Sequence, residues 1–290
     1  MALLGFALVA TTASIAIAAT ASRSAARISA TERTLAFGEK FRIGGSVPLD
    51  RGMDVRIKFR PAGADGWRLV RKTHSDRNGT FVTRVRARVN GAFKAVPAKG
   101  RASGHEAIEV RSRTAFHVGG HHLKLGRGVR LEGRARPGGR RAIKVVVRGP
   151  GGDVVRDRSA RSGRFALAWK PRRAGTYTLR AYTARNRKAK GSASAVRRVT
   201  AYRPAAASWY GPGFWGGRTA CGQTLSPGML GVAHKSMPCG TRLRLRYGGR
   251  TVRVRVIDRG PYAGSREFDL TQATRERLRF PSTGVVWTSK

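Results

Sequence analysis

Apolar and polar residues alternate along short segments through most of the chain. Residues 55–59 read Val-Arg-Ile-Lys-Phe, and residues 143–147 read Ile-Lys-Val-Val-Val. Gly, Asn, Asp and Pro residues separate these segments. A period of two between turn residues is typical of short β-strands that bury one face. The pattern therefore predicts an all-β protein.

The N-terminal two thirds of the chain contain an internal repeat. The matching stretches are Gly38–Val47 with Gly126–Ala135, Asp54–Gly63 with Ala142–Gly151, and Asn78–Phe93 with Ser162–Tyr177. The first two pairs are offset by 88 residues and the third by 84, a difference that a shortened surface loop explains. Each copy of about 80 residues suits a small immunoglobulin-like β-sandwich, without the inter-sheet disulfide because neither copy contains Cys.

A hairpin is the clearest local pattern near the C-terminus. Apolar residues alternate with arginines on both sides of Gly248-Gly249 within Thr241–Asp258. Gly-Gly between alternating runs predicts a two-residue turn. One face of the hairpin then carries Arg242, Arg244, Arg246, Arg253 and Arg255. Like charges opposite one another destabilise a hairpin, so this face favours an anionic partner; a solvated face is the alternative.

The composition changes after Tyr202. Residues Arg203–Ala207 are typical of a short linker, and the rest of the chain holds both cysteines and three of the five tryptophans. We therefore expect four parts: a signal peptide at 1–21, β-sandwich repeats at 22–118 and 119–202, and a separate domain at 203–290.

The first 21 residues carry no charged side chain and end in Ala19-Thr20-Ala21. An apolar stretch with an A-x-A ending indicates a secretory signal peptide; the alternative is an uncleaved membrane anchor. The sequence therefore predicts a secreted, extracytoplasmic protein with no stable membrane insertion after cleavage.

The net charge is extreme, because 59 Lys and Arg residues face 15 Asp and Glu residues, giving +44. Such a charge attracts polyanions. For an exported protein we expect peptidoglycan or other anionic wall polymers as partners, and not nucleic acid. The alternative is a general bias of the genome towards arginine, since arginine occurs in every segment. The oligomeric state stays open.

The only two cysteines are Cys221 and Cys239. In an exported protein an isolated pair predicts a disulfide, worth about 3 kcal/mol in the chain-entropy model; two reduced thiols are the alternative. Their spacing fits no zinc pattern, and we expect His121-His122 to lie in a surface loop. The sequence therefore predicts neither a metal site nor a cofactor.

Three of the 15 acidic residues fall within Val256–Leu270: Asp258, Glu267 and Asp269. Asp258 ends the second strand of the hairpin. Asp269 precedes a short predicted helix, where it suits the N-cap position with Gln272 completing a capping box. In so acid-poor a chain these carboxylates are the candidates for chemistry.

Three stretches of this region resemble the rare lipoprotein A (RlpA) family. They are Ala207–Leu225, Gly231–Leu245 and Arg253–Thr274, with the motifs ASWYG, AHKxxPxGT, DRGP and an acidic residue before Leu-Thr. The resemblance implies a six-stranded double-psi β-barrel with short helices, shared with expansins, and a lytic transglycosylase acting on peptidoglycan. The family's functional His and Asp fall on His234 and Asp258, and the expansin-like aspartate falls on Asp269. Ser208, Tyr210 and Thr219 fall on motif positions near the family's groove.

The sequence departs from the family pattern in three respects. It has no lipobox cysteine, it has Thr-Ala-Cys-Gly where Gram-negative members have Thr-Ala-Asn-Gly, and it carries β repeats in place of the wall-binding SPOR module. Because expansins also have CG motifs and do not hydrolyse their substrates, the cysteines keep a second interpretation open: an expansin-like protein that binds and loosens the wall without cleavage.

The acidic residues define the candidate chemistry. Glycosidic cleavage needs a proton donor, and a lytic transglycosylase manages with one carboxylate because the sugar's 6-hydroxyl attacks and gives a 1,6-anhydro product. We expect Asp258 to be the acid/base, with His234 orienting or sharing the proton and Asp269 nearby. The candidate substrate-binding residues are Ser208, Trp209, Tyr210, Phe214, Trp215, Thr219, Arg259 and Tyr262. The aromatic members suit either stacking on sugars or core packing.

Overall fold

The computed structural model describes residues 25–48, 52–150, 152, 154–158 and 162–290. The expected signal peptide at 1–21 lies outside this range. The chain divides into two compact units, one up to Arg113 together with Arg185–Gly191 and one made of Thr114–Ala184 and Ser192–Lys290. Among the described residues, no helix is both long and apolar enough to cross a membrane.

The first unit is built from two sheets. Its strands are β1 (Arg27–Ala30), β2 (Thr34–Ala36), β3 (Lys40–Ser46), β4 (Asp54–Pro61), β5 (Arg68–His74), β6 (Thr80–Arg86), β7 (Gly91–Pro97) and β8 (Glu106–Arg111). The sheet orders are β1-β3-β6 and β2-β8-β7-β4-β5. The alternating residues Val55 and Ile57 are fully buried with Phe41, Ile43 and Phe93 in one core. The period-two pattern thus predicted β4 and its buried face correctly.

The second unit begins with a module of similar construction. Its strands are β9 (Arg113–Val118), β10 (His122–Lys124), β11 (Val129–Arg136), β12 (Ala142–Arg148), β13 (Val154–Arg158), β14 (Arg164–Trp169), β15 (Gly175–Thr183), β16 (Ser192–Ala193) and β17 (Arg197–Tyr210). One sheet has the order β14-β11-β9, and the other contains β13-β12-β15-β17 with β10 on β17. The predicted surface loop at His121-His122 is wrong at His122, which begins β10 and pairs with β17.

A glycine–phenylalanine pair recurs in both copies of the repeat. Gly45 lies opposite Phe81 between β3 and β6, and Gly133 lies opposite Phe165 between β11 and β14. A Cβ on Gly45 would lie 2.0 Å from the Arg27 carbonyl oxygen, and one on Gly133 would lie 2.4 Å from that of Ala115. In each copy the phenylalanine ring also covers the glycine, at 2.7 and 2.3 Å from the same Cβ position. The repeat therefore preserves a close backbone approach that only glycine permits.

The C-terminal part closes into a six-stranded barrel. Its strands are β17, β18 (Val232–His234), β19 (Arg242–Tyr247), β20 (Arg250–Asp258), β21 (Phe268–Thr271) and β22 (Gly284–Thr288), with one helix, α1 (Gln272–Leu278), and a 3₁₀ turn at Pro212–Phe214. The order β17-β21-β18-β20-β19-β22 returns to β17 because β22 also pairs with β17. Each strand thus has two neighbours, and the sheet has no free edge. The all-β fold class and the barrel are confirmed.

The predicted hairpin is present. β19 pairs with β20 so that Leu245 lies opposite Val252, and the turn falls at Gly248-Gly249, both with positive φ. Leu243, Leu245 and Val254 are buried in the barrel core with Val232, Val256 and Phe268. The alternating arginines consequently lie on the other face.

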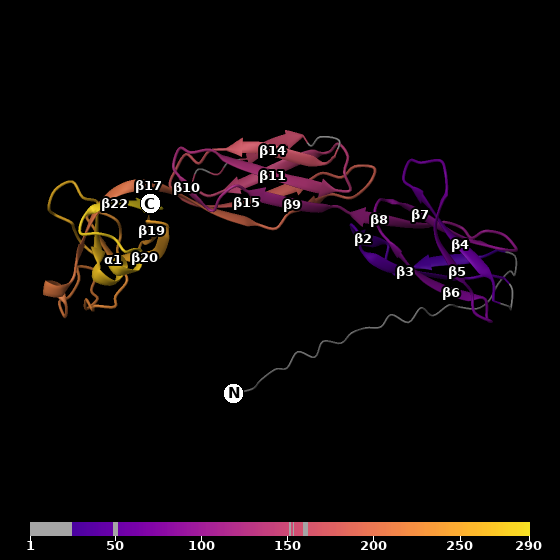
Figure 1. The fold of residues 1–290 in the computed structure, drawn as a ribbon, viewed down its shortest axis with the longest axis horizontal. Coiled ribbons are helices and arrows are strands. Elements are labelled where there is room, and N and C mark those ends of the chain that lie inside the picture. The colour runs from indigo at the N-terminus through magenta and orange to yellow at the C-terminus, as the bar shows by residue number, and fades with distance from the viewer. Residues whose placement is uncertain (1–24, 49–51, 151, 153, 159–161) are drawn as a thin grey trace, which may run out of the picture. The chain divides into compact units, whose positions relative to one another are not determined.

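The predicted linker is wrong, because Arg203–Ala207 lies within the continuous strand β17. The first part of β17 pairs with β15, and its later part pairs with β21 and β22 (Figure 1). Ala205 and Ala207 are buried between barrel strands, where small side chains permit close packing. The expected boundary at 202/203 therefore cuts through a strand.

Replacing Gly45 with Ala should destabilise the first unit by about 1–3 kcal/mol, because its Cβ would overlap backbone that cannot move aside without strain. Thermal unfolding followed by circular dichroism measures this loss. Gly104→Ala is the matched control, since a Cβ there meets nothing within 4 Å. Equal melting temperatures for the two variants would contradict the packing argument.

Candidate active site

Strand β18 brings two carboxylates together. Ala233 pairs with Asp258 of β20 on one side and with Asp269 of β21 on the other. Residues at the same level on neighbouring strands point to the same face of a sheet. Barrel closure thus places Asp258 and Asp269, 11 residues apart in the sequence, on the same face of one three-strand group.

Backbone amides hold the carboxylate of Asp258. Its Oδ1 accepts hydrogen bonds from the N–H groups of Ala220 and Arg259, both at 2.8 Å. Ala220 precedes Cys221, which forms a disulfide with Cys239 and donates its N–H to the Ile257 carbonyl. The predicted disulfide is therefore confirmed, and it fastens the loop that supplies one of the two donors to Asp258.

Asp269 lies in a more desolvated position. Its Oδ1 accepts a 2.8 Å hydrogen bond from Ser208 Oγ of β17. Burial raises the pKa of Asp269, and the negative charge of Asp258 adds to the rise, while the Ser208 hydrogen bond and Arg266 act against it. Asp269 therefore keeps a proton to higher pH than an ordinary aspartate.

The expectation that Asp269 caps a helix is wrong. Asp269 lies inside β21, and the N-cap of α1 is Thr271, whose side chain accepts from the N–H of Thr274. The Thr271 hydroxyl also donates to the Met229 carbonyl at 2.7 Å. Because Thr271 performs the capping, the carboxylate of Asp269 is available for another role.

The hydroxyl of Tyr210 lies beside both carboxylates. It is a buried polar atom with no hydrogen bond of good geometry to any described residue. Burial raises the pKa of Tyr210 far above its usual range, and the charges of Asp258 and Asp269 add to the rise. The phenol is therefore a protonated donor next to two carboxylates.

His234 organises the neighbouring loop. It is buried, and its Nδ1 accepts hydrogen bonds from the N–H groups of Ser236 and Met237 at 3.1 and 2.9 Å. The proton of the neutral ring is consequently assigned to Nε2, which lies 3.7 Å from Glu267 Oε1. Burial lowers the pKa of His234, opposed by Glu267.

No hydrogen bond joins His234 to Asp258 among the described residues. Successive residues of a strand point to opposite faces, so His234 faces away from the side on which Ala233 lies level with the two aspartates. On its own side it meets Glu267, which pairs through both oxygens with Arg203 at 2.7 and 2.5 Å. The side chain of His234 thus belongs to a separate polar cluster.

The guanidinium of Arg259 is directed away from Asp258. Its Nη1 donates to the carbonyls of Met237 and His234, at 3.0 and 3.4 Å, while only its backbone N–H contacts Asp258. Thr219 is buried, and its hydroxyl accepts from the N–H of Gln223 and donates to its side chain. Both residues therefore stabilise the loops around Asp258.

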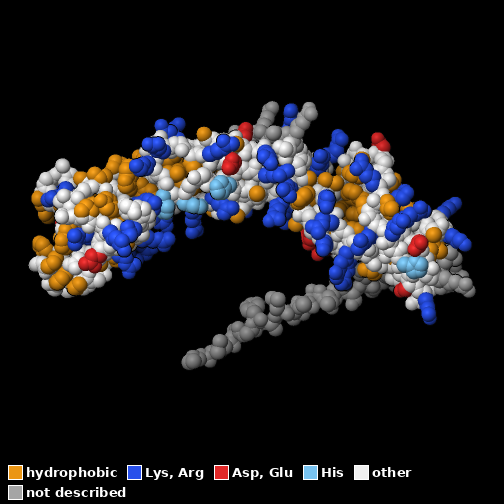
Figure 2. Space-filling view, in the orientation of Figure 1, with side chains coloured by type: hydrophobic (Ala, Val, Ile, Leu, Met, Phe, Trp, Pro, Cys, Tyr) orange, Lys and Arg blue, Asp and Glu red, His pale blue; other side chains and the backbone are white. Residues whose placement is uncertain are grey.

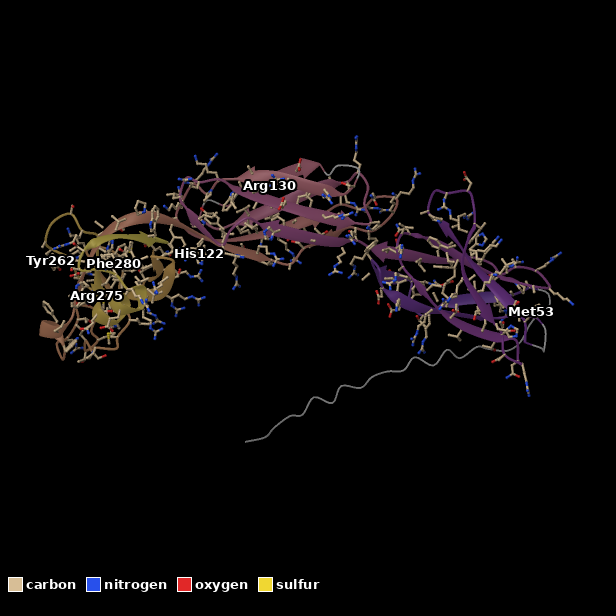
Figure 3. All side chains as sticks on the ribbon, viewed as in Figure 1. Met53, His122, Arg130, Tyr262, Arg275 and Phe280 are labelled. Carbon is tan, nitrogen blue, oxygen red and sulfur yellow. A yellow bond between two sulfur atoms is a disulfide. The ribbon has the colours of Figure 1, made fainter. Side chains whose placement is uncertain are left out.

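The aromatic candidates separate into two groups. Trp209 packs against the barrel core and stacks with Arg275, whose guanidinium lies 4.3 Å from the ring centre. Phe214, Trp215 and Tyr262 are 63%, 42% and 81% exposed. Tyr262 projects from the rim of the barrel, and Arg275 lies on the barrel itself (Figure 3). The three exposed rings are the ones that a polymer on the surface can reach.

Three partners of the site were not predicted from the sequence: the Ala220 amide, the Glu267–Arg203 pair as the environment of His234, and Arg266 beside Asp269. An amide contact leaves no trace in the side-chain pattern, and the Arg203 pairing depends on the strand that had been taken for a linker. The part of the chain that the structure describes contains no group of three or more His, Cys, Asp or Glu able to hold a metal ion.

Comparisons with known proteins agree with this architecture. Residues 203–288 match the family described as "Lytic transglycolase". A Synechocystis protein named "Probable endolytic peptidoglycan transglycosylase RlpA" is 38% identical over 96 residues, covering 32% of this chain and 29% of that protein. A Campylobacter jejuni protein named "Endolytic peptidoglycan transglycosylase RlpA" is 39% identical over 82 residues, covering 28% and 30%. The resemblance of the C-terminal domain to the RlpA proteins is confirmed.

The chain matches less than a third of the length of these relatives. A solved structure, the Streptomyces papain inhibitor, is 24% identical, with a TM-score of 0.26; the match covers 31% of this chain and 94% of the inhibitor.

The raised pKa of Asp269 makes a prediction about stability. Between the ordinary aspartate pKa of the unfolded chain and the raised folded value, the folded protein binds more protons, so its free energy of unfolding falls as pH rises through that window. Asp269→Asn cannot ionise, and Asn Oδ1 still accepts from Ser208. The stability of the variant relative to wild type should therefore increase from about pH 4 upwards.

Urea unfolding of both proteins from pH 3 to 8 measures this difference. Asp65→Asn is the control, because Asp65 is exposed. A stability difference for Asp269→Asn that does not change with pH would contradict the assigned burial.

Proposed function

We propose that this chain is an extracytoplasmic protein that cleaves peptidoglycan glycan strands as a lytic transglycosylase, with Asp258 and Asp269 as its acid/base pair. The observation that carries the proposal is the pairing of both aspartates with Ala233. The similarity to proteins named endolytic peptidoglycan transglycosylases supports the substrate class. An activity on peptidoglycan requires a location outside the cytoplasmic membrane, which agrees with the predicted secretion.

The two carboxylates are suited to different parts of the reaction. The raised pKa of Asp269 favours its protonated form, whereas two backbone amides hold the Asp258 carboxylate in place. Since their charges interact, the proton belongs to the pair, and Asp258 can deliver it to the substrate as the acid/base. The phenol of Tyr210 lies next to both carboxylates. It can donate a hydrogen bond to whichever of the two is ionised.

The proposed step balances without water. A proton from the pair goes to the glycosidic oxygen, the bond from that oxygen to the sugar's C1 breaks, and the 6-hydroxyl of the same sugar forms the new bond to C1. The hydroxyl proton returns to the carboxylate pair, which restores its starting state. The product is a 1,6-anhydro ring, and general acid–base help of this kind contributes about 10²–10⁴-fold.

His234 is a positioning residue in this proposal. Its ring nitrogen Nδ1 accepts hydrogen bonds from two backbone N–H groups of the 234–237 turn. The Arg259 side chain donates to carbonyl oxygens of the same turn. Because Arg259 supplies an amide to Asp258, the turn and the carboxylate are held together. The exposed rings of Phe214, Trp215 and Tyr262 provide surfaces on which sugars can stack.

The second candidate function is expansin-like binding and loosening without cleavage. It is favoured by the three exposed aromatic side chains, which bind glycan without any need for the carboxylates. This candidate uses the same barrel and the same polymer, and differs only in whether a covalent bond breaks.

Asp258→Asn should lower the release of 1,6-anhydro sugars from purified peptidoglycan by at least about 10²-fold, because Asn keeps the shape but carries no proton. Mass spectrometry of the soluble products measures the release. Binding to insoluble peptidoglycan should persist, because the exposed rings and the arginines are unchanged.

Asp269→Asn should also reduce release, since the pair loses its proton-holding member. Glu276→Gln is the matched control: Glu276 lies on α1, where its side chain accepts a 2.8 Å hydrogen bond from Gln272. This variant should release 1,6-anhydro sugars at the wild-type rate. A folded Asp258→Asn protein with wild-type release would refute the proposal. A wild type that binds but releases nothing would establish the second candidate.

A further inference from the structure

The β19–β20 hairpin carries two directly opposed arginine pairs. Arg242 lies opposite Arg255, and Arg244 lies opposite Arg253. The residues between them, Leu243 and Val254, point into the barrel core, so all four arginines rise from the outer face. Like charges in this position repel one another, which an anion bound between them would relieve.

These arginines line a groove of about 710 Å³ within the second unit. The other side of the groove is formed by Gly175, Thr176 and neighbouring residues at the start of β15, together with Ser289. No acidic side chain occurs among the described residues that line it. The groove shares no residue with the candidate active site, so it represents a separate surface.

Three of the four guanidinium groups are unpaired among the described residues, and one hydrogen bond orients the fourth. Arg244 is oriented by a 2.8 Å hydrogen bond from its Nη1 to Thr200 Oγ1. Arg242, Arg253 and Arg255 form no side-chain hydrogen bond or ion pair within the described part of the chain. Lys and Arg side chains spread over the visible face of the molecule, with few acidic ones (Figure 2), but opposed pairs that also line a groove are more than a general excess of charge.

The spacing of the arginines suits a repeating anion. Arginines two residues apart on one strand are separated by about 7 Å, and opposed ones by about 5 Å. A guanidinium binds phosphate or carboxylate through two parallel hydrogen bonds. Among the described residues that line the groove, none is aromatic, so the lining offers no ring on which nucleic-acid bases would stack. This favours a phosphate polymer that has no bases.

We propose that this groove binds a linear phosphodiester polymer without aromatic bases, held by Arg242, Arg244, Arg253 and Arg255. The binding does not rest on the cleavage proposed for the barrel. It would hold the protein on an anionic polymer while the carboxylate pair remains available to glycan.

The test compares two variants of the full chain that each lose two opposed arginines. Arg242→Gln/Arg255→Gln removes one pair from the groove. Arg42→Gln/Arg84→Gln removes a similarly exposed, directly opposed pair from β3 and β6 of the first unit. Binding of fluorescent poly(glycerol phosphate) is measured between 50 and 200 mM salt, and circular dichroism confirms that both variants are folded.

The groove variant should bind at least tenfold more weakly than wild type, and the control less than threefold. A plot of log affinity against log salt concentration has a negative slope. Its magnitude should decrease by about 1.5 in the groove variant, as expected for the loss of two phosphate contacts. Equal weakening in both variants would show a diffuse effect of charge and overturn the proposal.

Three further ligands test the chemistry. Poly-glutamate of equal length and single-stranded DNA should bind more weakly than poly(glycerol phosphate) and respond equally to both variants. Tighter groove-dependent binding of either one would overturn the assignment to a phosphodiester polymer. Inorganic phosphate should displace the polymer only when its concentration is at least 100-fold higher than that of the polymer's phosphate units. Displacement at equal phosphate concentration would assign the site to the free ion and would also overturn the proposal.

Discussion

The position of β18 between β20 and β21 is the constraint on which the candidate site depends. It sets Asp258 and Asp269 on either side of Ala233, and it exists only because the six strands close on themselves. Closure in turn requires β17 to pair with both β21 and β22. The strand that ends the second β module therefore also carries Ser208 and Tyr210, so the candidate site is continuous with the sheet that precedes the barrel.

Local patterns predicted several of the strands. Alternation identified β4, β12 and the β19–β20 hairpin because one face of each is buried, and the Gly248-Gly249 turn fixed the register of the hairpin. The predictions of a linker and of a helix cap were wrong for a common reason. Arg203–Ala207 and Asp269 have the local chemistry of a loop and of a cap, but strand pairing between distant segments determines their structure. The proximity of Asp269 to Asp258 and the separation of His234 from both likewise depend on pairing that no single stretch encodes.

The three carboxylates of the Val256–Leu270 region lie in distinct environments. Glu267 is paired with Arg203, so its charge is neutralised locally. Asp258 is held by amides and Asp269 by a hydroxyl, and Arg259 directs its guanidinium to carbonyls instead. Although the net charge of the chain is +44, no Lys or Arg side chain among the described residues forms an ion pair with either aspartate. This agrees with the raised pKa of Asp269, which burial causes and which the charge of Arg266 opposes.

In the proposed function, the carboxylate pair promotes glycosidic cleavage by attack of the sugar's own 6-hydroxyl. The most direct measurement is digestion of purified peptidoglycan by the wild-type protein in H₂¹⁸O, followed by mass spectrometry of the released fragments. Attack by the sugar's own 6-hydroxyl predicts fragments that end in 1,6-anhydro sugars and contain no ¹⁸O at the new terminus. Reducing ends labelled with ¹⁸O would show attack by water, and the absence of any released fragment would show a protein that binds glycan without cutting it; either result would contradict the account.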